Sequence, residues 1–152
     1  MDAWAFERLL EEADRRWNEG LAEKAIQLAE TAIGLYKGPF LPDDLEQSWA
    51  RSASERLRNK LLRCVTKLGD HWRQTGQWEK ARDCYLRGLD VDDLAESFCQ
   101  GLMVCYQHLG QRAEALSLYR QFERRINTVL GVEPAERTKA LRDALLINRM
   151  PG

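Results

Sequence analysis

Hydrophobic residues recur at steps of three and four along almost the whole chain, which is the spacing that places them on one face of an α-helix. The alternation typical of a half-buried β-strand is not found. Glycine and proline interrupt the pattern at intervals, so it predicts a series of helices joined by short turns. The expected helices cover residues 2–18, 21–36, about 45–75, 78–90, 94–108, 112–130 and about 135–147. We therefore expect an all-α protein of about seven helices.

The strongest interruption is the segment Gly38-Pro39-Phe40-Leu41-Pro42. Two prolines within four residues prevent a helix from resuming at once. The two apolar residues between the prolines are unusual for a solvated loop, and we expect them to fill a gap in the helical core. Asp43 or Asp44 can cap the long helix that follows. A second acidic segment, Asp92 to Glu96, has the pattern of a capping box for the helix at 94–108.

A 34-residue internal repeat organises the middle of the chain. The motif Leu68-Gly69-x-x-Trp72…Gly76…Ala81-x-x-x-Tyr85 recurs as Leu102-Met103-x-x-Tyr106…Gly110…Ala115-x-x-x-Tyr119. This period is the length of a tetratricopeptide helix–turn–helix unit, which cannot bury its apolar face alone and must stack on neighbours. We therefore expect one domain over residues 1–152, with clear repeat units at about 62–95 and 96–130. The predicted architecture is a tetratricopeptide-like right-handed stack of antiparallel helix pairs, closed by a C-terminal capping helix.

The first repeat is weaker and irregularly spaced. It matches the later repeats through Gly20 and Ala25, but Gly20 precedes Gly76 by 56 residues instead of 34. The additional residues hold the proline-containing segment and the N-terminal half of the long helix.

These additional residues carry a closer resemblance. The series Leu35-Tyr36-x-Gly38-x-Phe40-Leu41-Pro42-Asp43, then Trp49, then Arg56-Leu57, resembles the opening of the bacterial transcriptional activator domain. That domain is the tetratricopeptide-like module of regulators related to the Streptomyces antibiotic regulatory proteins. The resemblance covers roughly residues 4–146 and departs at Asp93, where the family has proline. It continues through Asp92-x-Leu94-x-Glu96, Leu102-Met103, Leu109-Gly110-x-Arg112-x-Glu114-Ala115-Leu116-x-x-Tyr119 and Leu130-Gly131-Val132-Glu133-Pro134.

The resemblance implies a regulatory protein–protein interaction module. In that family the module normally follows a winged-helix DNA-binding domain, and larger members add an ATPase region. Neither a strand-bearing wing nor a G-x-x-x-x-G-K-[ST] loop is found in this sequence, so we expect an excised module or a free-standing relative. The expected partners are other domains of the same regulator, a second copy of the chain, or RNA polymerase. Two alternatives remain open: a general tetratricopeptide scaffold unrelated to transcription, and a metabolite sensor.

Composition and charge agree with a cytoplasmic protein that does not itself read DNA. The chain has 23 Lys+Arg against 24 Asp+Glu, without the basic excess that phosphate binding favours. No apolar run approaches the roughly 18 residues of a membrane span, and no signal peptide is recognised. No C-x-x-C pair occurs, so we interpret the cysteines as small buried hydrophobes in a reducing compartment. They are Cys64, Cys84, Cys99 and Cys105.

The sequence gives little support for catalysis, a cofactor or a bound metal. His71 and His108 are the only histidines, and no Ser/His/Asp or Cys/His arrangement with a supporting motif is found. Cys105 and His108 would share a helix face, as a metal-ligating pair could, but no further ligands with suitable spacing accompany them. We therefore predict a non-enzymatic protein with no metal and no cofactor.

The candidate binding surface is the inner groove that first helices line in a tetratricopeptide stack. Its mixture of charges and amides suits a peptide or protein better than an apolar small molecule. The candidate residues are Asp14, Trp17, Arg63, Thr66, Asp70, Arg73, Gln74, Gln100, Val104, Gln107 and His108.

Two further features of the helices have competing interpretations. A basic stripe, Arg56, Lys60, Arg63 and Lys67, could dock an acidic partner, but we favour an exposed helix face whose aliphatic stems cover apolar surface. Five tryptophans are many for this length, and we expect Trp72 and Trp78 at least to lie in the core.

Overall fold

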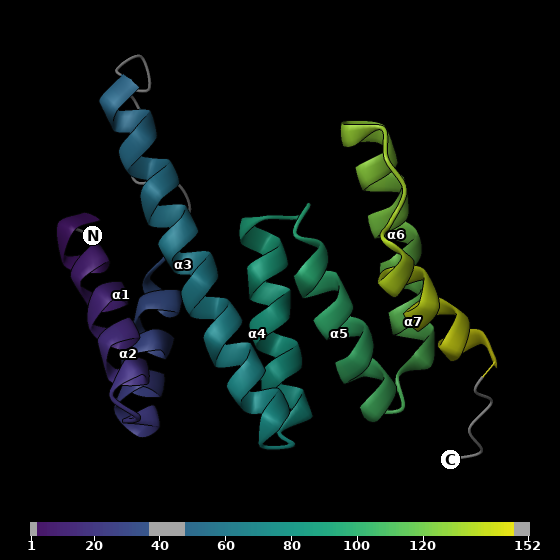
Figure 1. Cartoon of the computed structure of the whole chain (residues 1–152), viewed down its shortest axis with the longest axis horizontal. Coiled ribbons are helices and arrows are strands. Elements are labelled where there is room, and N and C mark those ends of the chain that lie inside the picture. Colours follow the sequence, from purple (N-terminus) through teal and green to yellow (C-terminus); the bar gives the residue numbers. More distant parts are fainter. Residues whose placement is uncertain (1–2, 37–47, 148–152) are drawn as a thin grey trace. The chain divides into compact units, whose positions relative to one another are not determined.

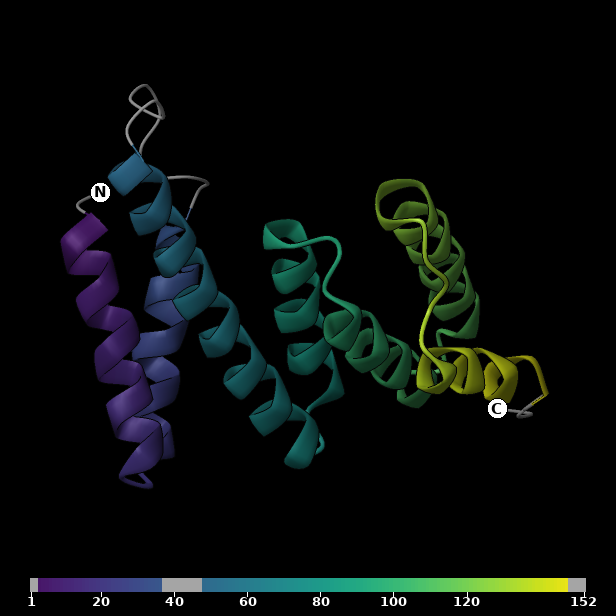
Figure 2. The same ribbon diagram turned by 45° about the horizontal axis from the view of Figure 1, so that its top comes forward.

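The computed structural model describes residues 3–36 and 48–147, with side chains in the second range from residue 52 onward. Every regular element in these ranges is an α-helix (Figures 1 and 2). The helices are α1 (Ala3–Asn18), α2 (Ala22–Leu35), α3 (Ser48–Gln74), α4 (Trp78–Val91), α5 (Glu96–His108), α6 (Arg112–Leu130) and α7 (Glu136–Ile147). The predicted fold class, all-α with about seven helices, is confirmed for this part of the chain.

The chain divides into two compact units, Met1–Leu68 and Gly69–Gly152. The boundary falls inside α3, so the first part of that helix belongs to the first unit and its last residues to the second. The expected single domain and the limits of its repeats stay predictions. The expectations for Gly38–Pro42 and for a cap at Asp43 or Asp44 concern residues outside the described ranges.

Three helix pairs are joined by turns with the same hydrogen bonds. In the turn between α3 and α4, Gly76 has a φ of 75°, its N–H donates to Arg73, and the next N–H donates to Trp72. Gly20 and Gly110 occupy equivalent turns with φ values of 77° and 73°. This left-handed helix ending is sterically easy only for glycine. The weak first repeat that Gly20 indicates is therefore a helix hairpin of the same construction as the other two.

The first unit packs small residues of α2 against larger ones of α1. The residues Ala25, Ala29 and Ala32 are fully buried, which lets the two antiparallel helices approach closely. Across from them α1 buries Phe6 and Leu10. The part of α3 in this unit buries a stripe of its own, consisting of Leu57, Leu61, Cys64, Val65 and Leu68.

Tyr85 of α4 lies between two glycines in the second unit. A Cβ added to Gly69 would lie 2.6 Å from the ring, and one added to Gly101 would lie 2.8 Å from its opposite edge. Both distances are below van der Waals contact, so α3 and α5 approach the ring this closely only because neither glycine carries a side chain. The Tyr85 hydroxyl donates a hydrogen bond of 2.5 Å to Asp70.

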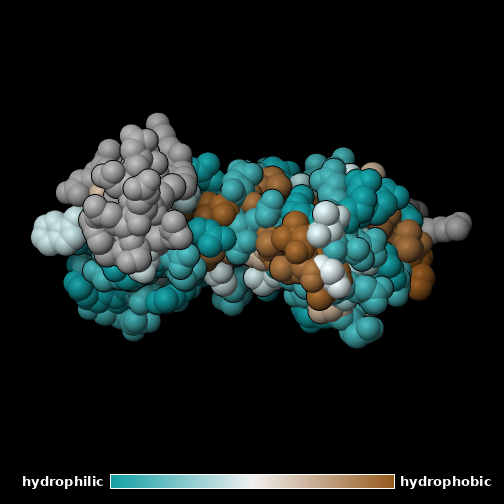
Figure 3. Space-filling view, turned by 90° about the horizontal axis from the view of Figure 1, so that it is seen from above, coloured by the Kyte–Doolittle hydropathy of each residue, from teal (hydrophilic) through white to brown (hydrophobic). Residues whose placement is uncertain are grey.

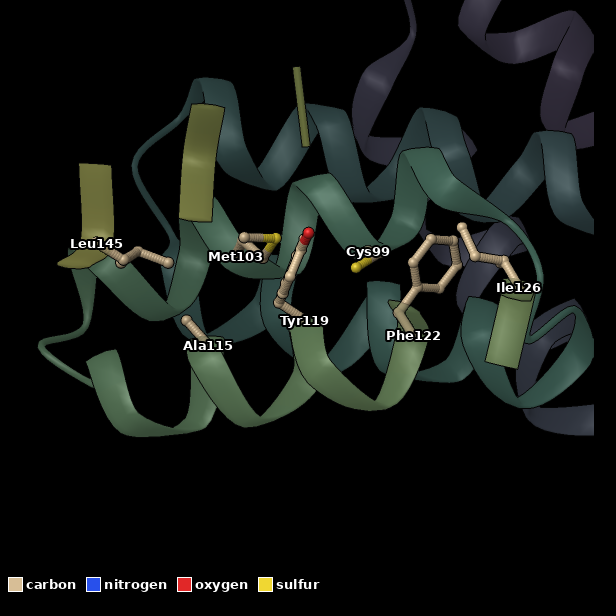
Figure 4. Close-up of a cluster of buried hydrophobic side chains, with 7 residues drawn as sticks. All are labelled: Cys99, Met103, Ala115, Tyr119, Phe122, Ile126 and Leu145. Carbon is tan, nitrogen blue, oxygen red and sulfur yellow. The ribbon is translucent and has the colours of Figure 1, made fainter. Parts of the chain in front are cut away.

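The second half of this unit has a core cluster that α7 helps to close (Figure 4). Tyr119, Phe122 and Ile126 come from α6, and Leu145 from α7. Because α7 packs on both α5 and α6, it fills the role of the predicted capping helix within this unit. The complete cluster is Cys99, Met103, Ala115, Tyr119, Phe122, Ile126 and Leu145.

The expected capping box at the start of α5 is wrong. Ala95 is the N-cap residue and makes no side-chain cap hydrogen bond, while a side-chain oxygen of Asp92 accepts from the N–H of Leu94. Glu96 reaches α7 instead: one of its oxygens accepts from the N–H of Ala135 at 2.7 Å and from the hydroxyl of Thr138. The glutamate therefore stabilises the N-terminus of a helix distant in the sequence.

A glycine and a proline shape the turn between α6 and α7. Gly131 ends α6 in a left-handed conformation with a φ of 67°, and Pro134 is buried as the chain turns toward α7. Leu130, the last residue of α6, is 55% exposed, and its neighbour Val129 is 60% exposed. On the face shown in Figure 3, hydrophobic side chains form separate patches among hydrophilic ones. Across the described residues, none of the helices combines the length and the apolar character needed to cross a lipid bilayer.

Candidate functional site

The candidate groove residues all lie on the first helices of their pairs, α1, α3 and α5. Asp14, Trp17, Arg63 and Thr66 belong to the first unit, and the other seven belong to the second. In the first unit the structure brings three of them, Asp14, Trp17 and Arg63, to one pocket. That all the candidates line one groove stays a prediction.

Several of the second unit's candidates are occupied by contacts inside the protein. The Gln100 amide donates to the hydroxyl of Thr138 at 2.9 Å, and so joins the network that holds α7. Asp70 accepts from Tyr85 and lies 3.9 Å from the Arg73 guanidinium. Burial, reinforced by the hydrogen bond to Asp70, raises the pKa of Tyr85 well above its usual range. These polar groups therefore hold helices in place, and their hydrogen-bonding atoms are already engaged within the protein.

The remaining candidates present a mixed surface on the second unit. Gln74 and Gln107 are exposed, and Val104 is half-buried. The exposed ring of His108 stacks face to face on Trp78, with the ring centres 3.7 Å apart and the planes 4° from parallel. Such a stacked pair offers a flat aromatic face that can contact the side chains of a polypeptide.

The stacked pair also bears on two earlier interpretations. Trp78 is only half-buried, so its expected place in the core is wrong, whereas Trp72 is buried as predicted. Cys105 is fully buried, whereas the ring of His108 stacks on Trp78, so the two side chains do not converge on one metal position. Among the residues with described side chains, no group of three or more potential ligands is close enough to hold a metal ion.

All four cysteines are buried and free, as predicted. Burial raises the pKa of Cys64 and of Cys99 to about 12. Because the thiolate is the reactive form, these thiols serve as core residues rather than nucleophiles.

The basic stripe of α3 is an ion-pair ladder to α1. Glu7 accepts from Arg56 at 3.0 Å and from Lys60 at 2.6 Å. Lys60 also reaches Glu11 at 2.7 Å. Hydrogen bonds from Arg56 and then Lys60 lower the pKa of Glu7, and the bonds to Glu11 and Glu7 raise the pKa of Lys60.

The ladder replaces two expectations from the sequence. The stripe is neither a free docking strip nor a merely solvated face, because Arg56, Lys60 and Lys67 all have carboxylate partners on α1. Glu11 is one of those partners. Since Glu7 pairs with Arg56, Glu11 with Lys60 and Asp14 with Lys67, the pairing shows that α1 and α3 run parallel in this unit.

Between two steps of this ladder lies a pocket of about 420 Å³. We call it the α1–α3 pocket. It contains three candidate groove residues, Asp14, Trp17 and Arg63. Thr66, also a candidate, is absent from the lining, and its hydroxyl donates back to the carbonyl of Leu62. The full lining is Leu10, Glu11, Ala13, Asp14, Arg15, Trp17, Lys60, Arg63, Cys64 and Lys67.

The sequence does contain a signal for the charged pocket residues that were not among the candidates, namely the spacing of acids and bases. Acids at 7, 11 and 14 have the four- and three-residue spacing of one helix face, as do the bases at 56, 60, 63 and 67. Matching the two series would have predicted an ion-pair ladder between the two helices, although equal spacing would have paired Asp14 with Arg63 and not with Lys67.

Fold and surface together define an all-helical protein built from helix hairpins, with polar side chains on its first helices. A family model described as "Bacterial transcriptional activator domain" matches residues 1–146. The chain therefore belongs to the bacterial transcriptional activator domain family, as its motifs predicted. This family is regulatory rather than enzymatic.

Two known proteins are similar to this chain. The transcriptional regulator RedD of Streptomyces coelicolor is 30% identical over 111 residues, which is 73% of this chain and 32% of RedD. The chain thus spans about a third of the length of that relative. A crystal structure of nearly identical TPR-like repeats from Podosopora anserina matches with a TM-score of 0.44 and 17% identity, over 95% of this chain and 85% of the other.

Proposed function

We propose that this domain regulates transcription by binding another protein through the exposed side chains of its first helices. The observation that carries the proposal is the family match over residues 1–146. The match assigns the chain to a family of regulators, and helical-repeat proteins act through contact surfaces rather than by catalysing a reaction. The partner is another domain of the same regulator, a second copy of the chain, or RNA polymerase.

The second unit supplies the contact surface of this proposal. Gln74 and Gln107 are exposed, and Arg73, which precedes Gln74 in the sequence, is half-buried. The stacked rings of Trp78 and His108 add a flat apolar face. Aromatic and arginine side chains dominate the energetics of protein interfaces, and amides adapt their hydrogen bonds to the partner.

The same proposal gives DNA no direct contact with this domain. The chain has 23 basic and 24 acidic residues, so it lacks the excess of positive charge that drives phosphate binding. In the basic stripe of α3, Arg56, Lys60 and Lys67 are paired with carboxylates of α1. We also propose that the domain works in the cytoplasm, without catalysis and without a cofactor.

A fluorescence anisotropy experiment tests this division of roles. The labelled chain is titrated with bacterial RNA polymerase holoenzyme, with unlabelled chain and with a winged-helix domain of a regulator of this family. In parallel it is titrated with a 30-base-pair duplex at physiological salt. We expect saturable binding to at least one protein and none to the duplex. Tight, salt-sensitive binding to the duplex, or no binding to any of the three proteins, would contradict the proposal.

A further inference from the structure

The α1–α3 pocket contains one cation that the protein does not neutralise. Four basic side chains line the pocket, and three of them have carboxylate partners on α1. These partners form the pairs Arg15–Glu12, Lys60–Glu11 and Lys67–Asp14. The fourth, Arg63, is exposed and has no hydrogen bond or ion pair within the described part of the chain. The pocket therefore has a net attraction for a single negative charge.

The lining beside Arg63 is apolar. Leu10 and Cys64 are buried, and the indole of Trp17 forms part of the wall. The thiol of Cys64 stays protonated at neutral pH, because burial raises its pKa to about 12, and so contributes no charge. A ligand that fits this lining carries an acidic group at one end and an aliphatic or aromatic body at the other.

The dimensions of the pocket favour a small molecule over a chain segment. The pairs Lys60–Glu11 and Lys67–Asp14 bridge α1 and α3 on either side of Arg63. Lys67 follows Lys60 by seven positions, which corresponds to about 10 Å along a helix. The volume of about 420 Å³ lies in the range of sites for metabolites, whereas an extended peptide would have to pass both bridges.

We propose that the α1–α3 pocket binds a small organic acid, whose carboxylate pairs with Arg63 and whose apolar body lies against Trp17. A planar guanidinium binds a carboxylate through two parallel hydrogen bonds, which makes Arg63 the specificity-determining residue. One uncompensated cation matches one carboxylate. This inference does not depend on the protein-contact role, which is placed mainly on the second unit.

Fluorine NMR of the chain labelled with 5-fluorotryptophan tests the proposal. The Trp17 resonance is assigned with a Trp17→Phe variant, while Trp72 and Trp78 of the second unit serve as internal references. The probe is 4-phenylbutyrate, and its uncharged amide is the matched control. We expect the acid to shift the Trp17 resonance saturably, with a dissociation constant at least about tenfold lower than that of the amide.

Two substitutions separate the proposed contact from a general effect of charge. Arg63→Gln should abolish the preference for the acid over the amide. Arg124→Gln, at another exposed arginine without a described partner, should leave the preference unchanged. Equal shifts for acid and amide, or an unchanged preference in Arg63→Gln, would overturn the proposal. So would a blocked Phe-Glu dipeptide that binds as tightly as the free acid, because it would assign the pocket to a side chain of a protein partner.

Discussion

At the scale of single residues, the second unit depends on an aromatic ring held between two backbones. Tyr85 lies against Gly69 of α3 and Gly101 of α5, and its hydroxyl is fixed by Asp70. The ring cannot move away from one glycine without approaching the other. In the next repeat the counterpart of Gly69 is Met103, which packs into the core cluster with Tyr119. The two repeats therefore share a tyrosine but surround it differently.

Replacing Gly101 with alanine should destabilise the protein. The new methyl group would lie 2.8 Å from the Tyr85 ring, and overpacking of this kind costs about 1–3 kcal/mol. The higher helix propensity of alanine returns about 1 kcal/mol, so we expect a net loss of about 1 kcal/mol of unfolding free energy. Urea unfolding followed by circular dichroism measures it.

Gly34→Ala is the matched control, because nothing lies within 4 Å of a Cβ at that helical position. That variant should be as stable as the wild type or up to about 1 kcal/mol more stable. If Gly101→Ala stabilises the protein as well, the ring is not confined as described.

At the scale of elements, ion pairs and a single glutamate decide which helices are joined. The ladder joins α1 to α3, although α2 and the segment after it lie between these two helices in the sequence. Most of its members are partly exposed, so individual pairs contribute little. Glu7 is the exception, since its side chain is 15% exposed and shared by Arg56 and Lys60.

Substituting Glu7 with glutamine should destabilise the protein by about 1 kcal/mol at neutral pH and low salt. The pKa of Glu7 is lowered in the folded state, so its stabilisation is present above the unfolded pKa of about 4.5 and is lost as the pH falls through the folded pKa. The difference between wild type and variant should therefore shrink from pH 6 toward pH 3. Chemical unfolding at several pH values measures it.

Glu11→Gln provides the comparison for the ladder. The Glu11 side chain is 52% exposed and has one partner, Lys60, so this substitution should cost less than Glu7→Gln. Equal losses for the two variants, or a Glu7→Gln loss that does not depend on pH, would contradict the assigned role of Glu7.

Removing the Glu96 carboxylate should loosen α7. Ala135 and Thr138 both donate to one of its oxygens, and hydrogen bonds to a charged group contribute about 1.5–3 kcal/mol each. In a Glu96→Ala variant, we expect the amides of α7 to exchange with deuterium at least about tenfold faster, while α6 keeps its protection. Glu136→Ala, at a side chain that is 95% exposed, should leave the exchange unchanged. Unaltered exchange in α7 of Glu96→Ala would show that packing of Leu145 alone holds this helix.

At the scale of the whole molecule, hydrophobic periodicity predicted the helices well because it depends on local spacing. The predicted ranges of the described helices agree with the observed ones to within about three residues. The capping box failed because Asp92 and Glu96 found other partners, and Glu96 in particular bonds to a helix about forty residues away. A sequence pattern for a local bond cannot register such a competing partner.

The candidate site was predicted less completely, for a related reason. Helical register correctly placed the eleven residues on first helices, but it did not show which side chains were already engaged. Gln100 and Asp70 bond within the protein, whereas Gln107 is exposed to solvent. Likewise the basic stripe could not be interpreted until its acidic partners on α1 were known.

The central claim is that this domain regulates transcription by protein contact through its first helices. Photocrosslinking tests it most directly, with p-benzoylphenylalanine placed at Gln107 on α5 and, as the matched control, at Arg124 on α6; both positions are exposed. We predict that illumination of living bacterial cells links the Gln107 position, and not the Arg124 position, to a regulator domain, a second copy or an RNA polymerase subunit. Crosslinks that are absent from Gln107, equal at both positions, or directed to proteins outside the transcription apparatus would contradict the claim.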